Sequence, residues 1–199
     1  MRLWDLMIAK KLKGPALPSG YTRLKGIQYA GATYYKITGF KLKSSDTVRI
    51  SASFSQACNV FGCYTTNEAT DNYSLYMSTT AGSKYLRYGN GTYASYCSSS
   101  NLNKRFNMVI TPTGSRGLPG TNDTWTAGSF TASVDMCIGT TSTSATSAKM
   151  SGKIYGNIVV DGRLCLIPCK RTSDDVIGYY DAKGETFYEP TGTAPTPIT

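Results

Sequence analysis

The side chains of this sequence offer few of the groups that enzymes use for catalysis. None of the 199 residues is histidine, so neither a Ser-His-Asp nor a Cys-His arrangement can form. The twelve acidic residues show no set suited to cleaving a sugar bond, which needs two carboxylates at a fixed separation. Asp174 and Asp175 are adjacent and would point to opposite faces of a strand, while Asp181 and Glu185 flank a turn. We therefore expect a protein that is not an enzyme.

Aromatic and amide side chains in two predicted loops suggest ligand binding instead. The sequence contains fifteen tyrosines, several of them in strand or hairpin context. A flat aromatic ring can stack on a sugar ring, and amide or carboxylate groups can orient the sugar hydroxyls. The alternative is that these aromatic residues belong to the core, because alternation buries one face of each strand. The candidate glycan-binding residues are Asn90, Tyr93, Tyr96, Asn122, Asp123 and Trp125.

The cysteines are expected to be small buried thiols in the reduced state. Their spacing contains no CxxC pair, since four residues separate Cys58 from Cys63 and three separate Cys165 from Cys169. No N-terminal segment resembles a signal peptide, which makes a disulfide framework the less favoured interpretation. A structural zinc site is a further alternative. The six cysteines are Cys58, Cys63, Cys97, Cys137, Cys165 and Cys169.

Positive charge is concentrated in the first quarter of the chain. The net charge is +9, and residues 1–49, with ten basic and two acidic side chains, supply +8 of it. This asymmetry predicts an anionic partner near that end, or alternatively a solvated basic edge that prevents wrong strand pairing. No basic run exceeds Lys10-Lys11, so we expect no nucleic-acid binding. No run approaches the roughly 20 apolar residues of a membrane span.

One segment has a helical pattern, residues 2–13. Asp5 in its first turn and lysines in its last turn suit the helix dipole, and Gly14-Pro15 would end it. We treat residues 1–14 as an anchoring or oligomerisation helix whose apolar stripe packs on its own domain, on another protein or on a membrane surface. The stripe consists of Leu3, Trp4, Met7, Ile8 and Leu12.

The rest of the chain has the pattern of β-strands separated by turns. Residues 47–55 alternate apolar and polar side chains, as does the segment that contains Phe106, Met108 and Ile110. Asp161-Gly162 and Asn90-Gly91 are the sequence's strongest hairpin turns. We therefore predict an all-β fold, an antiparallel two-sheet sandwich over residues 17–190, followed by an extended Pro- and Thr-rich tail at 191–199.

Both ends of the predicted sandwich resemble the laminin-G-like, concanavalin A-like jelly-roll domain of phage and prophage structural proteins from gut bacteria. The first end is "LPSGYTRLKGIQYAGATYYKITGFK" and the second is "GKIYGNIVVDGRLCLIPCKRTSDDVIGYYDAKGETFY". The matching residues at the first end are Leu17, Pro18, Gly20, Tyr21, Leu24, Ile27, Gln28, Tyr34, Thr38, Gly39 and Phe40. Those at the second end are Lys153, Ile154, Tyr155, Ile167, Pro168, Cys169, Lys170, Gly178, Tyr180, Asp181, Phe187 and Tyr188.

The resemblance implies a jelly-roll sandwich on the surface of a virion. "LWDLMIAKKL" also resembles the opening helix of small phage structural proteins, which implies docking to other virion proteins after assembly in the bacterial cytoplasm. A head decoration, head fibre or tail-associated protein that faces host-surface glycans is the implied function, as a homo-oligomer such as a trimer. A stand-alone carbohydrate-binding module is the alternative, and a glycoside hydrolase is less favoured. The family makes calcium at Asp71, Asp123 or Asp135 an open alternative to having no cofactor.

Overall fold

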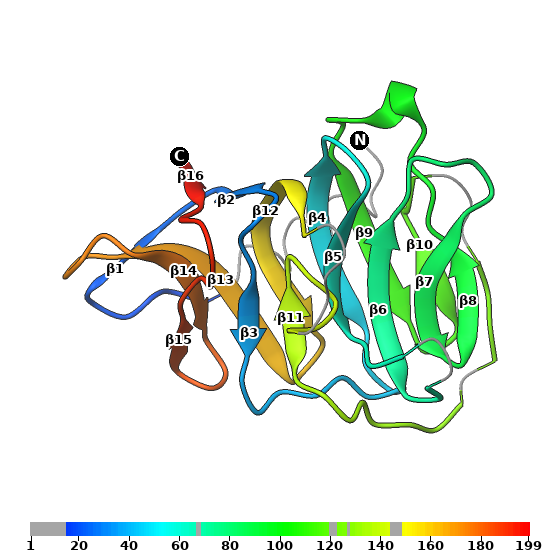
Figure 1. The fold of residues 1–199 in the computed structure, drawn as a ribbon. Helices are drawn as coiled ribbons and strands as arrows, with labels where there is room; N and C mark the ends of the chain where they lie inside the picture. Colours follow the sequence, from blue (N-terminus) through cyan, green and yellow to red (C-terminus); the bar gives the residue numbers. More distant parts are fainter. Residues whose placement is uncertain (1–14, 67–68, 120–122, 127, 144–148) are drawn as a thin grey trace.

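Two antiparallel β-sheets packed face to face form this protein. The computed structural model describes residues 15–66, 69–119, 123–126, 128–143 and 149–199, and all pairings between its named strands are antiparallel. In Figure 1 the smaller sheet lies in front of the larger one. The prediction of an all-β sandwich is therefore confirmed. The predicted helix at residues 2–13, with Leu3, Trp4, Met7, Ile8 and Leu12, lies outside the described residues.

The larger sheet has ten strands in the order β10-β9-β4-β12-β13-β14-β15, with β1 beside β13 and β2 between β12 and β16. Its strands are β1 (Tyr21–Arg23), β2 (Gly26–Ala30), β4 (Val48–Phe54), β9 (Phe106–Thr111), β10 (Gly114–Arg116), β12 (Ser151–Val160), β13 (Leu164–Arg171), β14 (Ile177–Asp181), β15 (Thr186–Tyr188) and β16 (Thr196–Ile198).

The smaller sheet has six strands in the order β3-β11-β5-β6-β7-β8. They are β3 (Tyr35–Ile37), β5 (Cys58–Cys63), β6 (Asn72–Met77), β7 (Lys84–Gly89), β8 (Gly91–Ala94) and β11 (Met136–Ile138). A single turn of 3-10 helix, η1 (Ser99–Asn101), lies between β8 and β9 in the chain.

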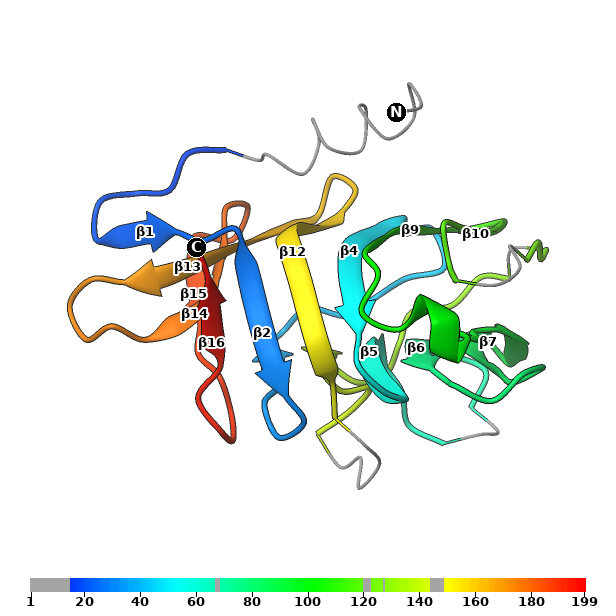
Figure 2. The same cartoon turned by 90° about the horizontal axis from the view of Figure 1, so that it is seen from above.

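Strand β12 changes partner halfway along its length and thereby divides the larger sheet. Residues 151–155 pair with β2, whereas residues 158–160 pair with β13. Between them Gly156 has a φ of 63°, a left-handed conformation that glycine adopts without strain, and its N–H donates to the Lys25 carbonyl. In Figure 2 β13, β14, β15 and β1 lie together at one end of the larger sheet, and Tyr179 of β14 packs on Tyr35 of β3 with ring centroids 4.9 Å apart.

The core lies between the sheets and contains several whole tyrosine side chains. Tyr29, Tyr35, Tyr73 and Tyr179 are almost completely buried. Their hydroxyl groups have partners, as buried polar groups require: Tyr29 and Tyr179 bond each other at 3.0 Å, and Tyr73 lies 3.2 Å from two backbone carbonyl oxygens. All six cysteines are free and buried, as the sequence predicts.

The structure confirms the two predicted hairpins and corrects the description of β4. Asp161-Gly162 joins β12 to β13, and Asn90-Gly91 joins β7 to β8. Strand β4 is expected to be half-buried, yet both of its faces are covered. Its polar face is buried because the side chains of β12 and of the segment before β9 cross it: Arg105 donates to Ser51 at 2.7 Å.

The C-terminal segment 191–199, predicted to be an extended tail after the sandwich, contributes a strand to the larger sheet. Residues 196–198 form β16 at its edge, paired with β2. Pro197 lies within β16 and donates no hydrogen bond, which an edge strand tolerates and a central strand does not. The sandwich therefore continues beyond residue 190, the predicted boundary.

Candidate glycan-binding groove

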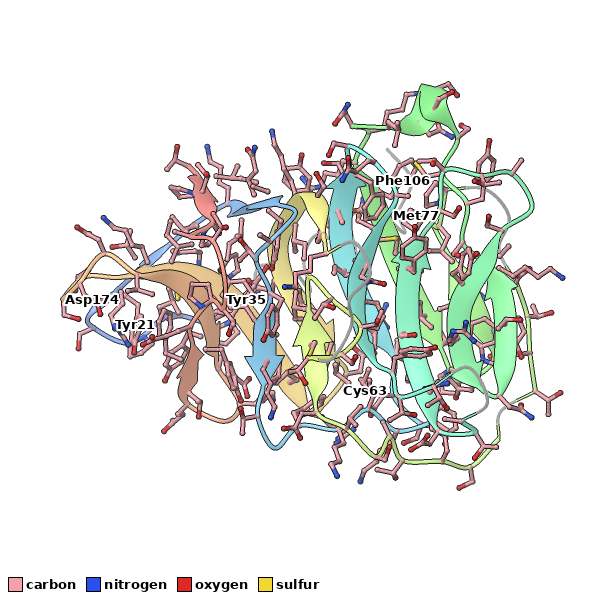
Figure 3. The ribbon with its side chains drawn as sticks, in the orientation of Figure 1. Tyr21, Tyr35, Cys63, Met77, Phe106 and Asp174 are labelled. Carbon is pink, nitrogen blue, oxygen red and sulfur yellow. The ribbon has the colours of Figure 1, made fainter. Side chains whose placement is uncertain are left out.

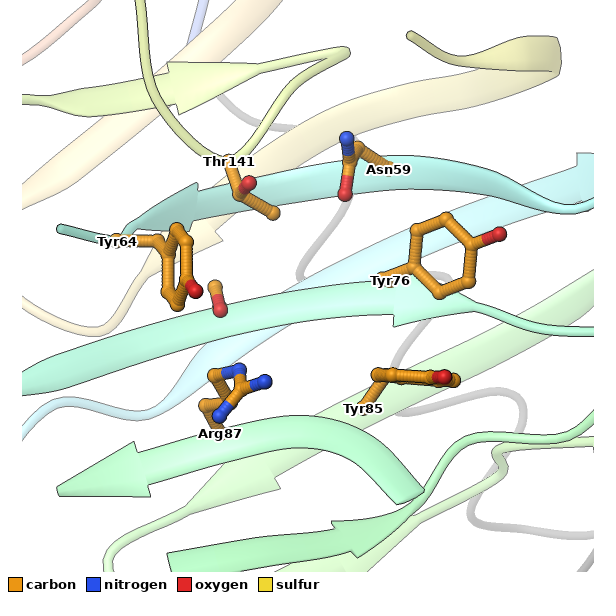
Figure 4. A pocket seen from close by; sticks show the side chains of 7 residues that line it. Asn59, Tyr64, Tyr76, Tyr85, Arg87 and Thr141 are labelled. Carbon is orange, nitrogen blue, oxygen red and sulfur yellow. The ribbon is translucent and has the colours of Figure 1, made fainter. Parts of the chain in front are cut away.

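An open groove lies on the outer face of the smaller sheet, across β5, β6 and β7. Its volume is about 280 Å³, and Figure 4 shows its side chains arranged on both sides of the middle strand. Two hydroxyl side chains, one amide, three tyrosines and one guanidinium line it. These residues are Asn59, Tyr64, Ser74, Tyr76, Tyr85, Arg87 and Thr141.

Strand register produces the shape of the groove. Gly62 of β5 pairs with Ser74 of β6, and Ser74 pairs with Arg87 of β7. Ser74, the smallest of the lining residues, therefore lies beside Gly62 and between the larger side chains at either end of the groove. A Cβ atom on Gly62 would lie 2.3 Å from the Ser74 Cβ, so this close approach of β5 and β6 requires glycine.

Two tyrosines form one end of the groove. The rings of Tyr76 and Tyr85 meet edge to face, with their centroids 5.1 Å apart and their planes at 76°. Tyr85 is 43% exposed and is the only large hydrophobic side chain so exposed among the described residues. Burial, followed by the proximity of Cys58 and Tyr85, raises the pKa of Tyr76 above its ordinary value. Its hydroxyl therefore keeps its proton at neutral pH and can donate a hydrogen bond.

A tyrosine and an arginine form the other end. The Arg87 guanidinium carbon lies 5.2 Å from the centre of the Tyr64 ring, within the range of a cation–π interaction. This contact spans the width of β6, from β7 to the residue after β5. One end of the groove therefore consists of the Arg87 guanidinium and the Tyr64 ring, and the other end consists of the two tyrosines Tyr76 and Tyr85.

The lining residues have the chemistry of recognition. Sites that combine apolar or aromatic surface with a few polar groups are typical of small-molecule binding, and strands hold such groups more rigidly than loops do. The seven lining residues include no carboxylate. Hydrolysis of a glycosidic bond by paired acids therefore has no counterpart in this groove.

The structure brings three of the glycan-binding candidates together, on the inner side of the smaller sheet. The Trp125 ring lies 4.5 Å from that of Tyr93 and 5.1 Å from that of Tyr88, and Trp125 is only 8% exposed. Asp123 accepts a hydrogen bond from the Ala94 N–H and so fixes the loop to β8. These side chains extend the core at the edge of the sheet.

The other three candidates are placed differently. Asn90 is exposed in the hairpin turn, and half-buried Tyr96 forms an isolated bridge with Ser78. Asn122 lies outside the described residues. None of the six predicted residues lines the groove on β5–β7.

The aspartates considered for calcium have protein partners. Asp71 accepts a hydrogen bond from the Ser133 N–H at 2.7 Å, and Asp135 forms an ion pair with Lys36 at 3.4 Å. Within the described residues, no group of three or more His, Cys, Asp or Glu side chains is placed to hold a metal ion.

Sequence reasoning missed the groove, although a signal for it was present. In "NYSLYM" and "KYLRYG" the alternation that places Tyr73, Leu75 and Leu86 inside places Ser74, Tyr76, Tyr85 and Arg87 outside. Two adjacent strands thus each present tyrosine on the same outer face. Only the knowledge that β6 pairs with β7 shows that these outward-facing residues line one groove.

Comparison of the chain with family models, with curated proteins and with solved structures found no match. Across the described part of the chain, the structure contains no helix with the length and apolar character needed to cross a membrane.

Proposed function

We propose that this chain is a non-enzymatic adhesive protein that binds carbohydrate in the groove on β5, β6 and β7. The supporting observation is the combination of exposed Tyr85, its partner Tyr76 and the Tyr64–Arg87 pair on either side of the small residue Ser74. Aromatic faces offer apolar surface to the C–H face of a sugar ring. The hydroxyl, amide and guanidinium groups offer hydrogen bonds to its hydroxyls.

A glycan array with variants of the groove tests this proposal. We expect the wild-type chain to bind a subset of bacterial or mucosal glycans, and Tyr85→Ala to weaken that binding about tenfold, or about 1.4 kcal/mol. Tyr180→Ala is the matched control, because Tyr180 is a partly exposed tyrosine on β14 that lies outside the groove. Absence of binding to every glycan, or equal losses in both variants, would overturn the proposal.

The biological setting that we propose is the surface of a phage particle. This part of the proposal draws on the sequence resemblance to phage jelly-roll domains, and the two-sheet antiparallel sandwich is compatible with a jelly-roll, concanavalin A-like connectivity. The chain would be a decoration, fibre or tail-associated protein. Its residues 1–14 would dock to other virion proteins or to sister chains, and the groove would face the host.

Deletion of residues 1–13 tests the anchoring role. We expect virions assembled with the truncated chain to lack it in negative-stain images, and the purified truncated chain to have a smaller mass in solution if the segment also holds an oligomer together. Normal occupancy of the truncated protein on particles would refute anchoring. It would leave a stand-alone carbohydrate-binding module as the remaining role for the groove.

A further inference from the structure

A second hollow lies beside the groove and shares Tyr64 with it. Its volume is about 430 Å³, and Thr141 of the groove is followed directly by Ser142 and Thr143 of the hollow. Tyr64 lines both, and Thr141 of the groove adjoins Ser142 of the hollow in the chain, so the groove and the hollow are neighbours on the surface. The residues lining the hollow are Lys36, Lys41, Tyr64, Thr65, Ser133, Val134, Asp135, Ser142 and Thr143.

The hollow adds positive charge to the groove. Lys36 lies 3.4 Å from Asp135, yet its side chain remains 46% exposed. Lys41 is exposed, and among the described residues no ion pair joins it to a carboxylate. Together with Arg87 of the groove, three cations and one carboxylate line these two neighbouring sites.

These two lysines differ from two arginines of the same basic quarter of the sequence. Arg49 makes two hydrogen bonds to the Asp161 carboxylate, at 3.0 and 2.8 Å. Arg23 donates to the Asn157 side chain and to the Pro15 carbonyl. Those guanidinium groups hold the fold together, whereas Lys36 and Lys41 line a hollow that can admit a ligand.

We infer that the groove and the hollow together bind an acidic oligosaccharide. One sugar ring packs on the tyrosines of the groove, and a carboxylate or sulfate on a neighbouring unit contacts Lys41 and Lys36. This inference rests on the proposed carbohydrate-binding function and adds the class of ligand. Exposed ion pairs contribute about 0.2–1 kcal/mol each, so the charge selects among glycans that the aromatic groove already binds.

Paired acidic and neutral glycans test the inference on the full-length chain. The probes are tetragalacturonate and its methyl ester, sialyllactose and lactose, and a sulfated glycosaminoglycan fragment and its desulfated form. We expect the acidic member of a bound pair to bind more tightly, and the carboxylated and sulfated probes distinguish the two anion chemistries. Raising the salt concentration from 0.1 to 1 M shortens the Debye length from about 10 to about 3 Å and should remove this preference.

Lysine variants locate the preference in the hollow. We expect Lys36→Gln and Lys41→Gln together to weaken binding of the acidic probe about tenfold and to leave the neutral probe unchanged. Lys104→Gln removes the same charge beside η1, outside the groove and the hollow, and should have no effect. Tighter binding of the neutral members, or equal effects of Lys104→Gln and the double variant, would overturn the inference while leaving the carbohydrate site intact. Absence of binding to any glycan would overturn the carbohydrate site and the inference together.

Discussion

The two faces of the smaller sheet are built from the same strands and the same residue types, yet they differ in what they can do. On the inner face Tyr73, Tyr88 and Trp125 meet edge to face or tilted, and all three are buried. On the outer face Tyr76 and Tyr85 meet in a similar geometry beside an open groove. On β6 and β7 a tyrosine pair is a structural element or a candidate binding surface depending on the side of the strand from which it projects. Figure 3 labels Met77, the buried neighbour of Tyr76 on β6.

The largest expected effect is the loss of stability when Trp125, on the inner face, is replaced by alanine. Trp125→Ala should lower the free energy of unfolding by about 3–5 kcal/mol, because it leaves a cavity against Tyr93 and Tyr88. Tyr85→Ala on the outer face removes the edge-to-face contact with Tyr76 and should lower it by only about 0.5–1.5 kcal/mol. Urea unfolding measures both values. Trp125→Phe keeps a ring and removes an indole N–H that has no hydrogen-bond partner among the described residues, so it should cost less than alanine. Similar losses for Trp125→Ala and Tyr85→Ala would contradict the contrast.

The protein should lose stability at alkaline pH, because cysteine thiols are buried on the inner face of the smaller sheet. Burial raises the pKa of the Cys58 thiol to about 11 and that of Cys63 to about 12, from an ordinary value of 9.0. The unfolded chain ionises first as the pH rises, so the stability that these neutral thiols contribute is complete below pH 9 and is lost on the way to pH 11–12. At about pH 10 the two thiols together should cost about 2–3 kcal/mol.

Urea unfolding at pH 8 and pH 10 checks this expectation. The Cys58→Ala, Cys63→Ala double variant is the control, and its stability should fall less between the two pH values. The same loss in the variant and the wild type would show that these two thiols do not cause it.

A side chain at Gly62, next to Ser74 of the groove, should disturb both the packing of the strands and the groove. Gly62→Ala places a Cβ atom 2.3 Å from the Ser74 Cβ, so β5 and β6 must separate. We expect a loss of about 1–3 kcal/mol in the free energy of unfolding. Binding of the glycan identified for the wild type should weaken as well. Gly128→Ala, which meets no atom within 4 Å, is the matched control and should leave both quantities unchanged. Wild-type stability in Gly62→Ala would show that the strands tolerate a side chain there.

The smallest expected change in stability concerns the contact between Arg87 and Tyr64 at one end of the groove. Arg87→Gln removes the cation that lies over the Tyr64 ring and should lower stability by about 0.5–1 kcal/mol. A double-mutant cycle with Tyr64→Leu isolates the contribution of this pair from other contacts of Arg87. A coupling energy near zero would mean that the two side chains meet without stabilising each other.

Much of the fold could be predicted because local patterns determine it. Alternation in residues 47–55 identified the inner face of β4, and Asp161-Gly162 and Asn90-Gly91 identified two hairpins. These signals are local: strand geometry sends successive side chains to opposite faces, and tight turns require particular residues. The burial of Ser51 and Ser53 was missed because Arg105 and Tyr155, which cover them, are distant in the sequence.

The sequence by itself determined the class of fold, the absence of histidine-based chemistry and the excess of positive charge near one end. The tertiary structure alone decided which aromatic residues meet and which of them remain open to a ligand. Trp125 was a reasonable glycan-binding candidate by composition, and only its packing on Tyr93 places it in the core. Tyr64 follows β5, whereas Tyr76 and Tyr85 lie on β6 and β7, so the groove exists only once long-range pairing has set the register of these strands.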